Sequence, residues 1–70
     1  MKDELEYITQ RVRSVRKSKG LTQVELASLA GTTSVTVSRC EQGGNCTVDT
    51  LLQICHALKL SIVLIELQKE

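Results

Sequence analysis

Apolar residues near the start of the chain recur with the spacing of one helix face. Leu5, Ile8, Val12 and Val15 are separated by three, four and three residues, and residues so spaced lie on one side of an α-helix. Gly20 follows two lysines and can adopt the left-handed conformation in which helices commonly end. The pattern predicts a first helix that ends just before Gly20.

A second, shorter helix is predicted to begin directly after this stop. Thr22 and Glu25 have the spacing of a capping box, in which each side chain accepts a hydrogen bond from the other residue's backbone. Leu21 can pack against Leu26 across the helix start. Gly31 then supplies the next left-handed stop, so we expect this helix to lie between Thr22 and Gly31.

The stretch AGTTSVTVSRCEQG, residues 30 to 43, has the local composition of a strand, because β-branched side chains alternate with polar ones. Its boundaries instead resemble those of a helix. Gly31 and Gly43 lie near its ends, Thr33 is a suitable N-cap, and Val37 and Cys40 are three residues apart. These helix start and end signals therefore favour a third helix.

A fourth helix is predicted from Thr47, which can cap it, to about Lys59, with Asp49 in the first turn. Its apolar face has helical spacing and contains Val48, Leu51, Leu52, Cys55 and Leu58.

The last segment, residues 60 to 67, is predicted to be a β-strand, because only two of its eight residues are polar and several are β-branched. A single strand leaves its backbone groups unpaired. We therefore expect it to pair with the same strand of a second chain in a two-fold homodimer, burying Leu60, Ile62 and Leu64. The alternative is a fifth helix packed within the chain through Leu60, Leu64 and Leu67.

The length of 70 residues fits one domain, residues 1–70, with an aliphatic core, since the only aromatic residue is Tyr7. No apolar run approaches the roughly 20 residues of a membrane span, and the N-terminus does not resemble a secretory signal. These features predict a cytoplasmic protein, without a membrane partner, whose three cysteines are free thiols. Residues 11 to 39 hold six basic residues and one acid. This excess suits a polyanion, or simply a solvated helix face.

Residues 11 to 60 resemble the helix-turn-helix family of Cro and the phage repressors, the XRE type. The resemblance is carried by RSVRKSKGLTQVELASLAGTTSVTVSRCEQG and then by TVDTLLQICHALKL. It implies a mainly α, compact four-helix fold like that of lambda repressor, here with a C-terminal strand (residues 60–67) at the dimer interface. Gly31 would lie in the turn, and a recognition helix at about 33–42 would enter the major groove. Groove contact would explain the strand-like composition of that helix.

The resemblance also implies which side chains contact DNA. Family positions that meet phosphate are matched by Thr22, Gln23 and the N-cap Thr33. Positions that read or flank base edges are matched by Ser34, Val35, Thr36, Ser38 and Arg39. Arg39 can pair with guanine, and Val35 can pack on a thymine methyl group. The alternative is that the serines are merely solvated and that Arg39 pairs with Glu25 or Glu41.

A buried structural ion pair between Arg16 and Glu41 is a further implication of the resemblance. Cys40, Cys46, Cys55 and His56 are zinc ligands on paper, but no CxxC pair is present and two of these cysteines fall on core positions. We therefore expect neither a metal nor a cofactor. With one histidine and no paired carboxylates, we expect no enzymatic activity.

Two functions are consistent with these features. The first is a sequence-specific transcriptional regulator, a dimeric repressor of a palindromic double-stranded DNA operator. The second is an antitoxin-type module that binds a toxin protein and only secondarily DNA, because the tail ALKLSIVLIEL is similar to that of the HipB-type antitoxins.

Overall fold

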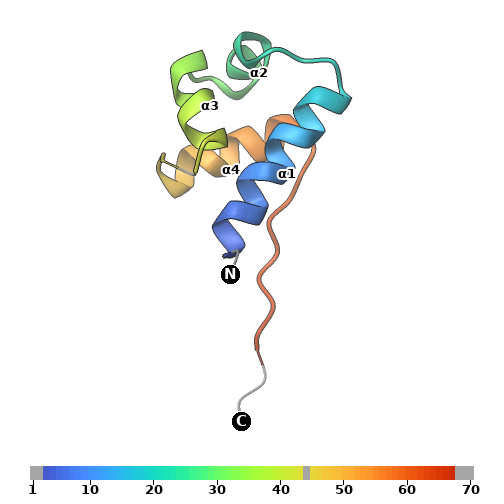
Figure 1. Ribbon diagram of the computed structural model, residues 1–70, viewed down its shortest axis with the longest axis vertical. Helices are drawn as coiled ribbons and strands as arrows, with labels where there is room; N and C mark the ends of the chain where they lie inside the picture. The colour runs from blue at the N-terminus through green and yellow to red at the C-terminus, as the bar shows by residue number, and fades with distance from the viewer. Residues whose placement is uncertain (1–2, 44, 68–70) are drawn as a thin grey trace.

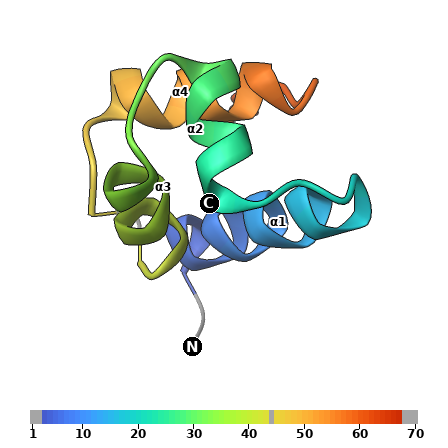
Figure 2. The same cartoon turned by 90° about the horizontal axis from the view of Figure 1, so that it is seen from above.

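Short connections join four α-helices in the part of the chain that the structure, a computed structural model, describes, residues 3–43 and 45–67. The helices are α1 (Glu4–Ser18), α2 (Gln23–Ala30), α3 (Ser34–Glu41) and α4 (Val48–Ala57). α2 packs against α3 and α4, and α1 packs against α3. Figure 2 shows α1 and α4 on opposite sides of the domain with α2 between them, and Figure 1 shows α2 and α3 at the end of the domain away from the C-terminal tail. The mainly α, four-helix prediction is confirmed.

Each helix begins at a residue whose side-chain oxygen accepts a hydrogen bond from the backbone N–H three residues later. The predicted caps Thr22, Thr33 and Thr47 all do so, and Thr22 and Glu25 form the complete capping box. The cap of α1 is Asp3, which accepts from the third residue on at 2.8 Å. Local side-chain chemistry therefore accounts for where the helices start.

Three of the helices end within two residues of a residue in the left-handed conformation. After α1 that residue is Gly20, with φ 71°, as predicted. Gly31 has φ 73° and directly follows α2, so a side chain there would be strained. α4 ends at Ala57, two residues before the predicted end, and Lys59 is left-handed with φ 64°. The N–H of Leu60 reaches back to the carbonyl of Cys55 at 2.8 Å, which completes a Schellman-type ending.

The hydrophobic core lies where the four helices meet. Its members are Val12, Leu26, Ala27, Val37, Cys40, Leu51, Ile54, Cys55 and Leu58. The predicted face of α1 is buried mainly at Val12, whereas Leu5 is exposed and Ile8 and Val15 are partly buried. On α4, Val48 is exposed and Ile54 is fully buried. Of the predicted α4 face, Leu51, Cys55 and Leu58 are buried as expected, and Leu52 is partly buried. The prediction was wrong in including Val48 and omitting Ile54.

The C-terminal segment forms neither the predicted strand nor the alternative fifth helix within the single chain, over its described residues 60–67. Leu60 and Ile62 pack against the core, but the side chains beyond them have no surface of their own chain to cover. The exposed large apolar residues of this segment are Val63, Leu64, Ile65 and Leu67. Figure 1 shows this tail running away from the helices. A β-ladder needs a second strand, and the described part of one chain supplies none.

No helix among the described residues combines the length and the apolarity that a membrane crossing requires.

Candidate nucleic-acid interface

Two short helices and a tight turn form the centre of the candidate site. α2 and α3 have eight residues each and are joined by residues 31–33. The N–H of Thr32 donates to the carbonyl of Ala27 at 2.9 Å, which holds the turn against the end of α2. Ala27 is buried and small, so it allows the two helices to approach closely. This geometry matches a helix-turn-helix unit.

α3 has one face in the core and one face in solvent. Val37, Cys40 and Glu41 are buried, whereas Val35 and Arg39, four residues apart, are exposed. The side chain of Val35 is 58% exposed although it is apolar. Such exposure does not stabilise the isolated domain, so these two positions are available for a partner.

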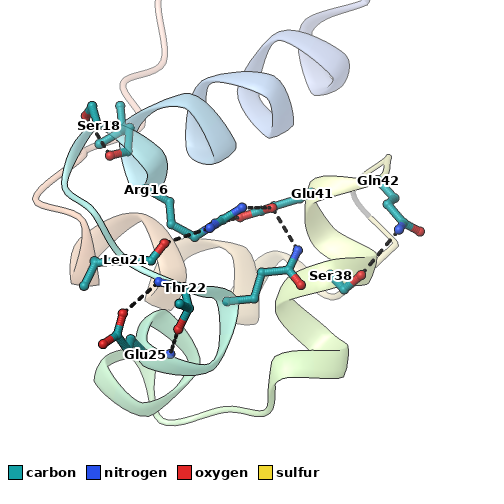
Figure 3. Close-up of polar contacts among 10 residues, drawn as sticks. Arg16, Ser18, Leu21, Thr22, Glu25, Ser38, Glu41 and Gln42 are labelled. Carbon is teal, nitrogen blue, oxygen red and sulfur yellow. Dashed lines mark hydrogen bonds and ion pairs between the residues drawn. The ribbon is translucent and has the colours of Figure 1, made fainter.

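The remaining predicted contact residues of α3 border this exposed face. Thr33 is exposed, whereas Ser34, Thr36 and Ser38 are partly buried. The hydroxyl groups of Thr33 and Thr36 lie 3.0 Å apart, and Ser38 accepts a hydrogen bond from the side-chain amide of Gln42 at 3.4 Å (Figure 3). These residues therefore flank the exposed face formed by Val35 and Arg39, with Thr33 at the N-terminus of the helix.

Arg39 has no ion-pair partner among the described residues, since Glu25 and Glu41 are engaged elsewhere. Glu25 accepts from the backbone N–H of Thr22 at 2.8 Å, and Glu41 pairs with Arg16. The alternative in which Arg39 is a surface ion-pair partner of these acids is therefore not realised.

A buried polar network connects three helices at the end of α3. Arg16 of α1 donates through Nε to Oε2 of Glu41 at 2.7 Å and through Nη2 to Oε1 at 3.1 Å. Its Nη1 donates to the carbonyl of Leu21 at 2.8 Å. Figure 3 shows the guanidinium lying between Leu21 and Glu41. The two charged side chains are only 9% and 2% exposed, so Arg16 fixes the orientation of α3 relative to α1.

Gln23 also belongs to this network. Its side-chain Nε2 donates to Oε1 of Glu41 at 3.1 Å and it is partly buried. The adjacent Thr22 is exposed. Sequence reasoning assigned Gln23 only to phosphate contact and missed the bond to Glu41, because the two residues are 18 positions apart and no local pattern links them.

The charge carried by residues 11 to 39 is predominantly positive. Of the six basic residues between positions 11 and 39, only Arg16 is buried, and its charge is paired with Glu41. The exposed ones are Arg11, Arg13, Lys17, Lys19 and Arg39. Such an excess attracts a polyanion from a distance within the Debye length.

The three cysteines lie in or against the core: Cys40 on α3, Cys55 on α4, and Cys46 in the loop between these helices. Cys40 and Cys55 are buried, Cys46 is partly buried, and all three are free. Burial and then a hydrogen bond with Cys46 raise the pKa of the Cys40 thiol to about 12. Burial likewise raises the pKa of Cys55. Among the described residues, no three side chains of the metal-ligating types lie together.

The raised pKa of Cys40 predicts a loss of stability at high pH. An unfolded thiol ionises near the ordinary value of 9.0, whereas the folded thiol stays protonated until about 12. The unfolded state therefore binds fewer protons above pH 9, and stability falls as the pH rises through this window. Between pH 8 and pH 10 we expect Cys40 alone to cost about 1 kcal/mol. Urea unfolding under reducing conditions measures this, and Cys40→Ala should show a smaller decrease; equal decreases would contradict the assignment.

The family profile HTH_3, described as helix-turn-helix, matches residues 12–65. The chain belongs to this helix-turn-helix family. It is the XRE/Cro type of helix-turn-helix, which is a DNA-binding and not an enzymatic family. The predicted family and the predicted lack of enzymatic activity are thus confirmed.

Solved structures agree with this assignment over nearly the full chain. HipB in the HipB–O1–O2 complex is 30% identical, with a TM-score of 0.81 over 94% of this chain and 97% of that one. The MDT protein is 29% identical, with a TM-score of 0.83, and covers 97% of both chains. The HipA–HipB–O2–O3 complex gives 29% identity and a TM-score of 0.82 with the same coverage. No curated protein sequence matches the sequence of this protein.

Proposed function

We propose that this helix-turn-helix protein is a cytoplasmic, dimeric transcriptional repressor that reads a palindromic operator through residues 33–42. The observation that carries the proposal is the exposed face of α3. An apolar side chain, Val35, and the guanidinium of Arg39, which has no ion-pair partner among the described residues, project from it while the opposite face is held in the core. Arg39 is suited to guanine and Val35 to the thymine methyl group. Ser34, Thr36 and Ser38 border these two and would complete the contact.

Phosphate contacts would surround this base-reading face. Thr22 and Thr33 are exposed hydroxyl residues at the N-termini of α2 and α3, where backbone N–H groups and the helix dipole favour an anion. Gln23 lies at the same end of α2 and is held by Glu41. We assign these three residues to the phosphate backbone, which positions the protein without reading sequence.

The C-terminal tail would join two chains into the dimer that a palindromic operator requires. Leu60 and Ile62 anchor it to the core, and four large apolar side chains follow in the open. Antiparallel pairing with the same segment of a second chain would satisfy the backbone and bury these side chains, with Leu64 near the two-fold axis. Two recognition helices would then face major grooves about 34 Å apart.

Selection from a random duplex library at moderate salt tests the function directly. The purified protein is expected to enrich a palindrome whose half-sites lie about one helical turn apart. A folded, dimeric protein that enriches no sequence would contradict the proposal.

In that case a protein partner becomes the better candidate. HipB also occurs with HipA in one of the similar structures, and the exposed apolar tail of this chain suits a protein interface. The antitoxin-type function, with a toxin as partner, is therefore our second proposal. Salt dependence separates the two, because DNA binding through several phosphates weakens steeply with salt while an apolar interface does not.

Arg39→Ala is expected to weaken binding to the selected operator by about 1 to 3 kcal/mol and to relax the preference at one base pair per half-site. Fluorescence anisotropy with operator and random duplexes measures both effects. Gln23→Ala is the comparison, since loss of a phosphate contact should weaken both duplexes by the same factor. If Arg39→Ala also weakened both equally, Arg39 would be a phosphate contact and not a base reader.

A further inference from the structure

The recognition helix and the loop after it share a pair of thiols that the proposed function does not use. Cys40 lies on the core side of α3, and Cys46 lies just before Thr47, the cap of α4. Their sulfur atoms are 2.8 Å apart and form a hydrogen bond. A disulfide bond has an S–S distance of about 2.0 Å, so a small shift of one side chain brings the sulfurs to bonding distance.

We infer that Cys40 and Cys46 form a dithiol modification site that a hydroperoxide converts to an intramolecular disulfide. Oxidation of a dithiol needs one thiol that the hydroperoxide can reach and a second thiol beside it. Cys46 is partly buried and reachable, whereas Cys40 is buried. The sulfur of Cys46 would therefore react first, and Cys40 would act second from within the core.

Proximity and hydrogen bonding support this order. The 2.8 Å contact holds the two sulfurs together, so Cys40 is in place to attack as soon as Cys46 has been oxidised. Burial also protects Cys40 from direct contact with the oxidant. Cys55 is buried as well, but no hydrogen bond joins it to either thiol in the described part of the chain.

The reaction balances in two steps. The Cys46 thiol loses its proton and its sulfur attacks one oxygen of the hydroperoxide; the O–O bond breaks, the departing alkoxide or hydroxide takes up that proton, and a sulfenic acid and an alcohol or water form. The sulfur of Cys40 then attacks the sulfenic sulfur, its proton joins the departing hydroxide, and water leaves as the S–S bond forms. Overall, two thiols lose two electrons and two protons, and the hydroperoxide is reduced. A small dithiol reverses the bond by exchange.

The bond would also stabilise the fold. It closes the chain between position 40 and position 46 and so removes conformations from the unfolded state. Because the sulfurs are already adjacent in the native structure, little strain opposes this gain. We expect the melting temperature to rise by about 10 to 20 °C.

Three single variants, each with one pair of cysteines left, test the site with hydrogen peroxide as the probe. After oxidation and alkylation, mass spectrometry of the peptide of residues 40–59 is expected to show loss of two hydrogens in Cys55→Ser, which keeps Cys40 and Cys46. Cys40→Ser and Cys46→Ser should not lose them. In the natural chain, fragmentation should locate the bond between residues 40 and 46, so the test does not depend on every variant folding.

A sulfinic acid on Cys46, a bond to Cys55, or a disulfide between two chains would each overturn the inference. So would a bond that lowers the melting temperature, because it would not fit the native fold. The two readouts are a peptide mass and a melting temperature, and neither depends on DNA binding. The dithiol inference can therefore fail without the proposed function failing, and the reverse.

Discussion

Arg16→Met is expected to lower the free energy of unfolding by about 3 to 5 kcal/mol. The substitution leaves the carboxylate of Glu41 buried, with the amide of Gln23 as its remaining side-chain donor in the described structure. A buried charge without its partner bears the full cost of desolvation. The carbonyl of Leu21 also loses the donor that Arg16 supplies. Urea or thermal unfolding measures the loss.

Two further variants separate the buried pair from the loss of a positive charge. Arg13→Met removes an exposed arginine from the same helix and is expected to change stability by less than about 0.5 kcal/mol. The double variant Arg16→Met, Glu41→Leu removes both charges and should recover most of the loss, because a buried ion pair is often replaceable by apolar groups. A double variant as unstable as Arg16→Met would mean that lost packing, and not the stranded carboxylate, causes the effect.

Leu64→Lys is expected to weaken binding to the full palindromic operator by about 100- to 10,000-fold, on the proposal that the tail pairs two chains. Leu64 is 93% exposed in the single chain, so its replacement should leave the fold of each protomer intact. In the dimer it would bring two positive charges close to the two-fold axis in an apolar interface, where like charges repel. The two half-sites would then be bound independently, and the gain from linking them would be lost.

Sedimentation equilibrium and anisotropy titrations test this directly. Leu29→Lys is the matched control: it adds the same charge at an apolar residue that is 63% exposed on α2, and it should leave both mass and affinity unchanged. Binding to a single half-site should be the same for both variants. A Leu64→Lys protein that remains dimeric and binds the palindrome normally would exclude the tail as the dimer contact.

Features that depend on neighbouring residues in the chain were predictable from sequence. Thr22, Thr33 and Thr47 each cap a helix by accepting a hydrogen bond from the backbone N–H three positions on. Gly31 ends α2 in the left-handed conformation, which glycine adopts without the strain that a side chain would cause. Strand-like composition did not mislead at α3, since these end signals outweighed the β-propensity of its threonines and valines.

Features that depend on distant contacts were not predictable from the same patterns. Spacing along α4 correctly placed Leu51, Cys55 and Leu58 in the core, but it did not show that Ile54 would be buried and Val48, at the start of the helix, exposed. The bond from Gln23 to Glu41 joins two helices and has no local signature. The tail was assigned a strand from composition alone, but a ladder requires a second chain, which one sequence does not contain.

The position of Glu41 separates two tasks that one helix must perform. Its carboxylate is linked to α1 through Arg16 and to the start of α2 through Gln23, so the docking angle of α3 is set at its C-terminal end. The side chains that would meet bases, Ser34, Val35 and Arg39, take no part in these bonds. Exchanging those three residues could therefore change which DNA sequence is preferred, while the hydrogen bonds of Glu41 keep the orientation of α3 unchanged.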